Sequence, residues 1–146
     1  MLPIVSLRPM KSSDTNFVYS TWLKSYRESL FAQNMSNTVY FKEHAAIITK
    51  IMESPDTNVT MIVDKDDDDH LYGYVVASVY PTTSVIHFCY VKYNYRRLGL
   101  MDNTLQTLHL INTGTPTVVT HIHRNHGFIS KRYNLEYNPY LLGEIE

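Results

Sequence analysis

The sequence predicts a mixed α/β (α+β) chain in which helices cover the faces of one sheet. Three observations predict it. Strand-like and helix-like segments are mixed along the chain, consecutive strand-like segments occupy its middle, and a strand–helix–strand order closes it. With 146 residues and 44% hydrophobic residues, we expect one domain with a real core, covering residues 1–146.

The first half of the chain is expected to hold one strand and two helices. Residues 2–7 are apolar with β-branched members, which favours a strand ended by Arg8 and Pro9. Residues 12–14 form a helix start signal, and the segment 15–29 then carries apolar residues at the spacing of one helix face: Val18, Trp22 and Tyr26. Residues 39–53 read as a second amphipathic helix.

The second half is expected to begin with a meander of strands. Residues 59–64, 71–80 and 85–93 are strand-like, and the Asp-rich run between the first two reads as a polar hairpin loop. After them we expect a helix, a strand, a short helix and an extended tail, at residues 100–111, 117–122, 127–133 and 137–145.

Composition excludes several classes of function. The 13 Lys and Arg against 14 Asp and Glu, a formal net charge of -1, argue against a nucleic-acid partner. The chain has no run of about 18 apolar residues and no signal-peptide core, so we expect no membrane partner. The one cysteine, Cys89, excludes an intrachain disulfide and indicates the cytoplasm.

The most informative stretch runs from Tyr90 to Met101, where a strand leads through a basic turn into a helix. A helix start presents unpaired N–H groups and a positive dipole end, which suit phosphate, and Gly99 allows a ligand to approach the backbone. These features allow a pyrophosphate site, and they also fit an ordinary surface turn.

This stretch resembles motif A of the GCN5-related N-acetyltransferases (GNAT), where a strand leads into Arg/Gln-x-x-Gly-x-Gly/Ala. The chain supplies, in order, Arg96, Arg97, Leu98, Gly99, Leu100 and Met101. Met101 departs from the family, because it stands where the motif has a small residue. Weaker resemblances lie at residues 3–9 followed by Asp14, at 61–64 and 71–75 with Gly73, and at Asn125 followed by Glu136 and Tyr137.

The resemblance implies a GNAT-like mixed, splayed sheet of six or seven strands with four helices. It implies an acyltransferase that moves an acetyl group from acetyl-coenzyme A, its co-substrate, to a small-molecule or protein amine. The coenzyme would be held by the backbone near Cys89, Tyr90 and Val91, by the motif A loop and by Asn125. A homo-oligomer stays open. Short members rich in Tyr and Asn also occur in phage genomes, which would place the chain in the host cytoplasm.

The resemblance also directs attention to two catalytic candidates. Many relatives have a Glu base on the fourth strand, but here no acid lies between Ser84 and Asp102. His87 is the side chain there that titrates near neutral pH, so it is the candidate base, against the alternative of an inert strand histidine. Tyr133 is the candidate acid for the leaving thiolate, although the family spacing from Asn125 falls on Arg132.

Other chemistries compete for the same residues. His121, His123 and His126 suggest zinc, but no Cys or acid nearby completes the set, and no metal is expected. Cys89 lacks the positive neighbours of a nucleophile. The run 64–69 lacks the Gly and Glu of a calcium loop.

Two rival functions also stay open. A non-catalytic GNAT-fold binding or structural protein is the alternative to an enzyme, and an unrelated α/β binding domain is a third option.

Overall fold

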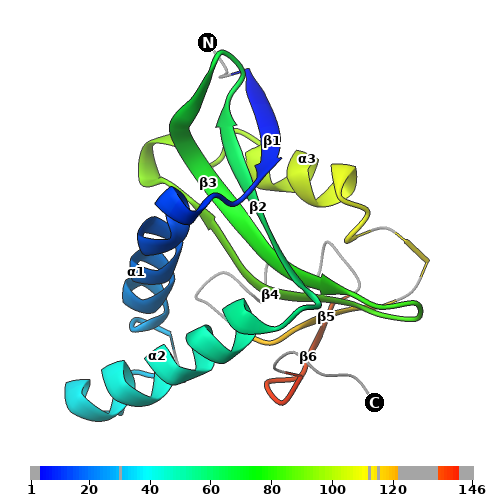
Figure 1. Cartoon of the computed structure of the whole chain (residues 1–146). Helices are drawn as coiled ribbons and strands as arrows, with labels where there is room; N and C mark the ends of the chain where they lie inside the picture. Colours follow the sequence, from blue (N-terminus) through cyan, green and yellow to red (C-terminus); the bar gives the residue numbers. More distant parts are fainter. Residues whose placement is uncertain (1–3, 30, 112, 115, 122–134, 142–146) are drawn as a thin grey trace.

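The structure is a computed structural model that describes residues 4–29, 31–111, 113–114, 116–121 and 135–141. Figure 1 shows a twisted sheet with helices packed around it. The elements are β1 (Val5–Pro9), η1 (Ser12–Asp14), α1 (Thr15–Tyr26), α2 (Asn37–Glu53), β2 (Thr57–Asp64), β3 (Asp67–Val79), β4 (Ser84–Val91), η2 (Tyr93–Tyr95), α3 (Leu100–Thr107), β5 (Thr117–Val119) and β6 (Leu135–Tyr137).

The strands form one mixed six-stranded sheet in the order β1-β2-β3-β4-β5-β6. Strands β1 to β4 pair antiparallel, whereas β4–β5 and β5–β6 are parallel. This confirms the predicted class. The helix predicted at 127–133 lies outside the described residues, and the described part holds three α-helices where four were expected for the whole chain.

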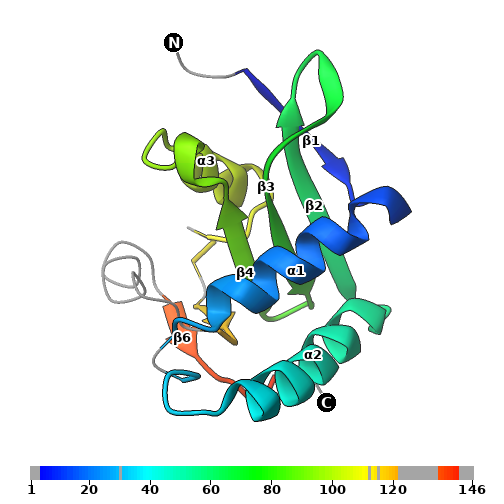
Figure 2. The ribbon, with the colours of Figure 1, turned by 90° about the vertical axis from the view of Figure 1, so that its left-hand side faces the viewer.

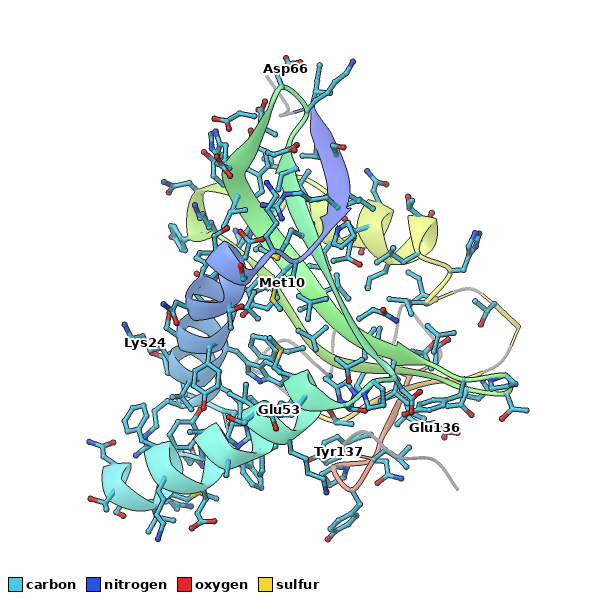
Figure 3. All side chains as sticks on the ribbon, viewed as in Figure 1. Met10, Lys24, Glu53, Asp66, Glu136 and Tyr137 are labelled. Carbon is cyan, nitrogen blue, oxygen red and sulfur yellow. The ribbon has the colours of Figure 1, made fainter. Side chains whose placement is uncertain are left out.

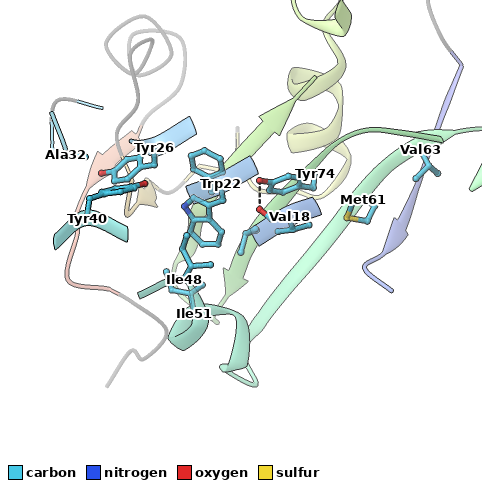
Figure 4. Close-up of a cluster of buried hydrophobic side chains, with 12 residues drawn as sticks. Val18, Trp22, Tyr26, Ala32, Tyr40, Ile48, Ile51, Met61, Val63 and Tyr74 are labelled. Atoms are coloured by element: carbon cyan, nitrogen blue, oxygen red, sulfur yellow. Dashed lines mark hydrogen bonds between the residues drawn. The ribbon is translucent and has the colours of Figure 1, made fainter. Parts of the chain in front are cut away.

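Helices α1 and α2 cover one face of the sheet, and α3 lies on the other (Figure 2). On the first face, the α1 residues Val18, Trp22 and Tyr26 are all buried, which confirms the helix face predicted from their spacing. Figure 4 shows them packed in a row, with the Tyr74 hydroxyl donating a hydrogen bond of 3.0 Å to the Val18 carbonyl. The strands β3 and β4 are thereby fixed beneath α1.

Strand β3 is buried on both faces. Tyr74 and Val76 belong to the cluster under α1 and α2, whereas Val75 and Ala77 pack with α3 residues such as Leu105. This two-sided burial explains why the sequence of β3 is continuously apolar rather than alternating.

The predicted polar hairpin is present, but its loop is shorter than predicted, because most of the Asp-rich run belongs to a strand. Strand β3 already begins at Asp67, which pairs with Asp64, and the turn consists of Lys65 and Asp66 at the tip of the hairpin (Figure 3). The Asp64 carboxylate accepts the N–H of Asp66 at 2.9 Å, so the acidic side chains stabilise a tight turn.

Several other boundaries differ from prediction by a few residues, and two of these differences have a local cause. Strand β1 continues to Pro9, because it is an edge strand and an edge tolerates the missing N–H of proline. Helix α3 ends at Thr107 rather than at 111, because His109 takes a left-handed backbone conformation with φ 56°. The apolar residues Leu110 and Ile111 are buried, but they pack against the sheet from the segment after the helix.

Candidate active site

Strands β4 and β5 run side by side only briefly. They pair over three residues, from Ser84 to Ile86 on β4, and the last backbone bond joins the Thr120 N–H to the Ile86 carbonyl at 3.2 Å. Strand β4 then continues to Val91 without a paired neighbour on that side among the described residues. Within the described part of the chain, the sheet is therefore open along the second half of β4, as the predicted splayed sheet requires.

A β-bulge at His87 decides which backbone groups face this opening. Val76 pairs with Phe88, and the next residue of β3, Ala77, pairs with Ile86, so His87 has no partner residue on β3. A bulge of this kind shifts the alternation of the strand by one residue and strengthens its twist.

Beyond the bulge, the ladder fixes the direction of each backbone group. The Lys92 N–H donates to the Tyr72 carbonyl at 2.8 Å, so the bonded pairs fall on alternate residues and include Tyr90. The backbone groups of Cys89 and Val91 therefore point to the open side. Of the three residues predicted to present backbone to a coenzyme, these two have the required direction.

The opening leads directly into the loop before α3. Strand β4 ends at Val91, and α3 begins at Leu100, as the predicted strand–turn–helix junction requires. Arg97 and Gly99 have left-handed backbones, with φ of 65° and 78°, and Gly99 precedes the first helical residue. A Cβ atom added at Gly99 would meet nothing within 4 Å, so the loop is open to a ligand there.

The side chains of this loop divide into two groups. Arg96 and Arg97 are exposed, and the Arg96 Nε donates a hydrogen bond of 2.7 Å to the Val91 carbonyl. Leu98 and Met101 are half-buried and Leu100 is buried, all packed toward the sheet. Met101, the departure from motif A, thus packs against the sheet rather than projecting freely over the loop.

Two of the three tyrosines near the loop pack within the protein. Tyr90 stacks on Tyr74 at 5.6 Å between ring centroids, and Tyr95 packs edge-on against Tyr72 at 4.5 Å. Tyr93 is 80% exposed, with the Arg96 guanidinium 5.7 Å from its centroid. Packing therefore explains Tyr90 and Tyr95, whereas the ring of Tyr93 stays exposed beside Arg96.

His87 is buried on the face that α1 and α2 cover. Its Nε2 lies 3.1 Å from Ser78 Oγ, its Nδ1 lies 3.0 Å from Thr120 Oγ1, and the residue is 1% exposed. Burial lowers the pKa of His87 to about 4. The imidazole is therefore neutral over the physiological range, but an amine could contact it only after one of its hydrogen bonds breaks.

The bonds of His87 belong to a longer buried chain that sequence reasoning missed. Thr120 Oγ1 also lies 2.9 Å from His121 Nδ1, and His121 Nε2 lies 3.0 Å from His44 Nε2. Trp22 and Tyr26 pack against the His121 ring, and the rings of Tyr26 and Tyr40 both stack on the ring of His44, the last residue of the chain of bonds. No local pattern could have revealed this chain, since it joins residues up to 77 positions apart.

Several residues singled out in the sequence lie outside the described residues: Asn125, Arg132, Tyr133, His123 and His126. Among the described residues, no group of three or more His, Cys, Asp or Glu is placed to hold a metal ion. The described part also contains no helix long and apolar enough to cross a membrane.

The thiol of Cys89 packs against the cluster under α3. Burial raises the pKa of this thiol to about 12, which disfavours the thiolate that a nucleophile would need.

The buried histidines predict a marked acid sensitivity. Burial lowers the pKa of His44 and of His87 to about 4 and that of His121 well below its ordinary value, the last also because the other two lie nearby. Unfolding releases each group to a pKa of about 6.5, so their stabilising effect is complete above that pH and is lost as the pH falls toward 4. Between about pH 7.5 and about pH 5.5, urea titrations should show a loss of about 3–4 kcal/mol in the free energy of unfolding.

An exposed histidine gives the control for this experiment. His109→Asn should still show the loss of stability between the two pH values, because it leaves the three buried imidazoles in place and Asn also tolerates the left-handed backbone. His44→Phe should make the free energy of unfolding depend less steeply on pH, by the contribution of about one proton. Equal stability of the unaltered chain at both pH values would show that the three imidazoles are not buried in the neutral form.

Comparison with known proteins supports the fold. No family model and no curated protein sequence matches the chain. A solved structure from Bacillus subtilis, proposed to be an acetyltransferase, superposes with a TM-score of 0.66 at 14% identity, covering 98% of this chain and 93% of that one. A proposed acetyltransferase from Pyrococcus furiosus gives 0.64 at 13% identity, covering 88% of this chain and 91% of that one.

A third structure, from Staphylococcus aureus and proposed to be a GNAT family acetyltransferase, gives a TM-score of 0.50 at 15% identity, covering 70% of this chain and 86% of that one. The chain therefore has the fold of the GCN5-related N-acetyltransferases, as the resemblance of residues 90–101 implies.

Proposed function

We propose that this chain transfers an acetyl group from acetyl-coenzyme A to an amine. One observation carries the proposal. The open side of β4, with the backbone groups of Cys89 and Val91, is continuous with the open loop at Gly99 and the start of α3. An extended thioester that ends in a pyrophosphate needs these two surfaces in this order.

The described residues fit such a ligand. The amide groups of the pantetheine arm would pair with the backbone at Cys89 and Val91, as an added strand does at a sheet edge. The pyrophosphate would lie against the backbone of residues 97–101, with the charges of Arg96 and Arg97 beside it. Because Arg96 bonds to the Val91 carbonyl, it must turn away from β4 when the pantetheine pairs there.

The amine would approach from the side of α1, α2 and the late strands, where His87 and the buried chain lie. We propose His87 as a residue that handles the amine proton through its hydrogen-bonded neighbours, Tyr133 as the acid for the thiolate, and Asn125 as a further coenzyme contact. The cytoplasm is the proposed location, since its reducing conditions preserve the free thiol of Cys89.

Two substitutions test the coenzyme site. Arg96→Ala removes a charge-assisted phosphate contact, and Gly99→Glu adds bulk and negative charge where the loop is open. Isothermal titration with coenzyme A should show a loss of about 1.5–3 kcal/mol for Arg96→Ala, and a larger loss for Gly99→Glu. Lys24→Ala, which removes a charge from the exposed surface of α1, should bind like the unaltered chain (Figure 3). Unchanged affinity in both site variants would move the site elsewhere.

A specific observation supports a second candidate, a coenzyme-binding protein without transfer activity. Strand β4 carries no acidic side chain, and both nitrogens of His87 are already hydrogen-bonded. Tight coenzyme binding without acetylation of any amine would favour this second function over the first.

A further inference from the structure

The buried polar side chains on the α1 and α2 side of the sheet form one continuous row. Beyond the bonds already described, Ser78 Oγ lies 3.3 Å from Thr57 Oγ1. The row therefore contains six side chains whose neighbours lie between 2.9 and 3.3 Å apart: Thr57, Ser78, His87, Thr120, His121 and His44. Thr57 is half-buried, whereas the other five side chains are buried.

The end of the row at His44 sets the direction of every hydrogen bond. His44 Nδ1 is buried and has no hydrogen-bond partner among the described residues. A buried N–H without an acceptor is costlier than a lone pair without a donor, so Nδ1 is the bare nitrogen and Nε2 carries the proton. The His44 Nε2–H then donates to His121 Nε2.

The remaining donors follow by the same rule, because a neutral imidazole has one donor and one acceptor nitrogen. His121 Nδ1–H donates to Thr120, whose hydroxyl donates to His87 Nδ1. His87 Nε2–H donates to Ser78, whose hydroxyl donates to Thr57. All five bonds thus point from His44 toward Thr57, and no link has two donors or two acceptors facing each other.

We propose that this row is a proton relay through the interior, with its basic end at His44 Nδ1 and its solvent end at Thr57. A proton that binds His44 Nδ1 displaces the Nε2 proton to His121. Each further link passes its own proton on, and the Thr57 hydroxyl releases one proton to water. The reverse passage takes one proton from water and delivers one from His44 Nδ1, which restores the original direction of the bonds.

Its use in catalysis rests on the proposed function. The forward passage would remove the proton of the attacking amine, and the reverse passage would supply the proton that the leaving thiolate of coenzyme A takes up. One proton enters the row from the amine and one leaves it for the thiolate. A neutral amine and acetyl-coenzyme A therefore give the amide and the thiol, and the number of protons in the row does not change. His44, on α2, packs against Tyr26 of α1 and against His121 at the end of β5, on the side from which the amine would approach. Because His44 Nδ1 is buried, the amine would contact it only after the side chains around it move.

The direction of the bonds can be measured without any activity. In the full chain labelled with ¹⁵N-histidine, nitrogen chemical shifts distinguish bare from protonated ring nitrogens. We expect bare Nδ1 on His44, with protons on His44 Nε2, His121 Nδ1 and His87 Nε2. A proton on His44 Nδ1 would overturn the proposal.

Conduction is tested at Thr120, where the chain offers a matched pair of variants. Thr120→Val keeps the shape of the side chain but breaks the row, whereas Thr120→Ser keeps the hydroxyl. In the unaltered chain and in Thr120→Ser, the His44 Nε2 proton, whose path to Thr57 passes through Thr120, should exchange with solvent about 100-fold faster than the buried amides of β3, which exchange by unfolding. In Thr120→Val it should exchange at the amide rate, and equal exchange in all three chains would overturn the proposal.

The catalytic use has its own test. With an amine that the unaltered chain acetylates, Thr120→Val should lower kcat by about 100-fold, leave KM for acetyl-coenzyme A unchanged and make the rate rise with buffer concentration, whereas Thr120→Ser should do none of these. Equal kcat and buffer dependence in the two variants would overturn the catalytic use. If the exchange results are as expected but no amine is acetylated, the relay stands and the proposed function fails.

Discussion

Gly73→Ala is expected to lower the free energy of unfolding by about 3 kcal/mol, although it adds only one methyl group. A Cβ atom at Gly73 would lie 2.1 Å from the carbonyl oxygen of Tyr90 and 3.0 Å from the Cα of Val91. Both atoms belong to the backbone of β4, so no side-chain rotation can relieve the clash. The strand would have to move at the place where its open side begins to serve the proposed coenzyme site.

The matched control for this change is Gly99→Ala. A Cβ atom there meets nothing within 4 Å, so its cost comes only from the left-handed backbone, with φ of 78°. That cost is about 1–2 kcal/mol. Urea titration of both variants decides the matter: if Gly73→Ala is no more destabilising than Gly99→Ala, the close approach of β3 and β4 is not as described.

His87→Gln is expected to lower the rate of acetyl transfer by about 100-fold or more. Gln keeps the size and can still bond to Ser78 and Thr120, but an amide does not take up and pass on a proton as an imidazole does. Because burial lowers the pKa of His87 to about 4, titration of this residue should not change the rate between about pH 6 and about pH 9. A histidine with an ordinary pKa would give a step at about pH 6.5.

The measurement is thiol release from acetyl-coenzyme A across this pH range, with His109→Gln as the control on an exposed histidine. Equal rates in the unaltered chain and in His87→Gln would leave positioning of the reactants as the mechanism, with solvent taking the proton.

The sequence predicts best where local patterns decide the structure. Spacing alone identified the buried face of α1 at Val18, Trp22 and Tyr26, and the resemblance to motif A located the start of α3 after Gly99. Local pattern misleads where a few backbone angles decide where an element ends. The apolar spacing predicts a longer α3, but the left-handed backbone of His109 ends the helix early.

The polar chain through His87 was beyond prediction for a different reason. Its members come from five elements or their ends, and the β-bulge that turns His87 toward Thr120 depends on the register between β3 and β4. His121 was noticed in the sequence as a metal candidate, but its partner is His44, on a helix far earlier in the chain. Only the packing of α2 against the sheet brings the two imidazoles together.

The central claim is that the open side of β4 and the Gly99 loop hold acetyl-coenzyme A for transfer to an amine. The most direct measurement is incubation of the full chain with acetyl-coenzyme A and a panel of primary amines and peptides, with mass detection of the acetylated product and Gly99→Glu as the control. The account predicts an acetylated amine in equal amount to the released thiol, strongly reduced by Gly99→Glu. Formation of the same product by Gly99→Glu at an unchanged rate, or of none by the unaltered chain, would contradict it.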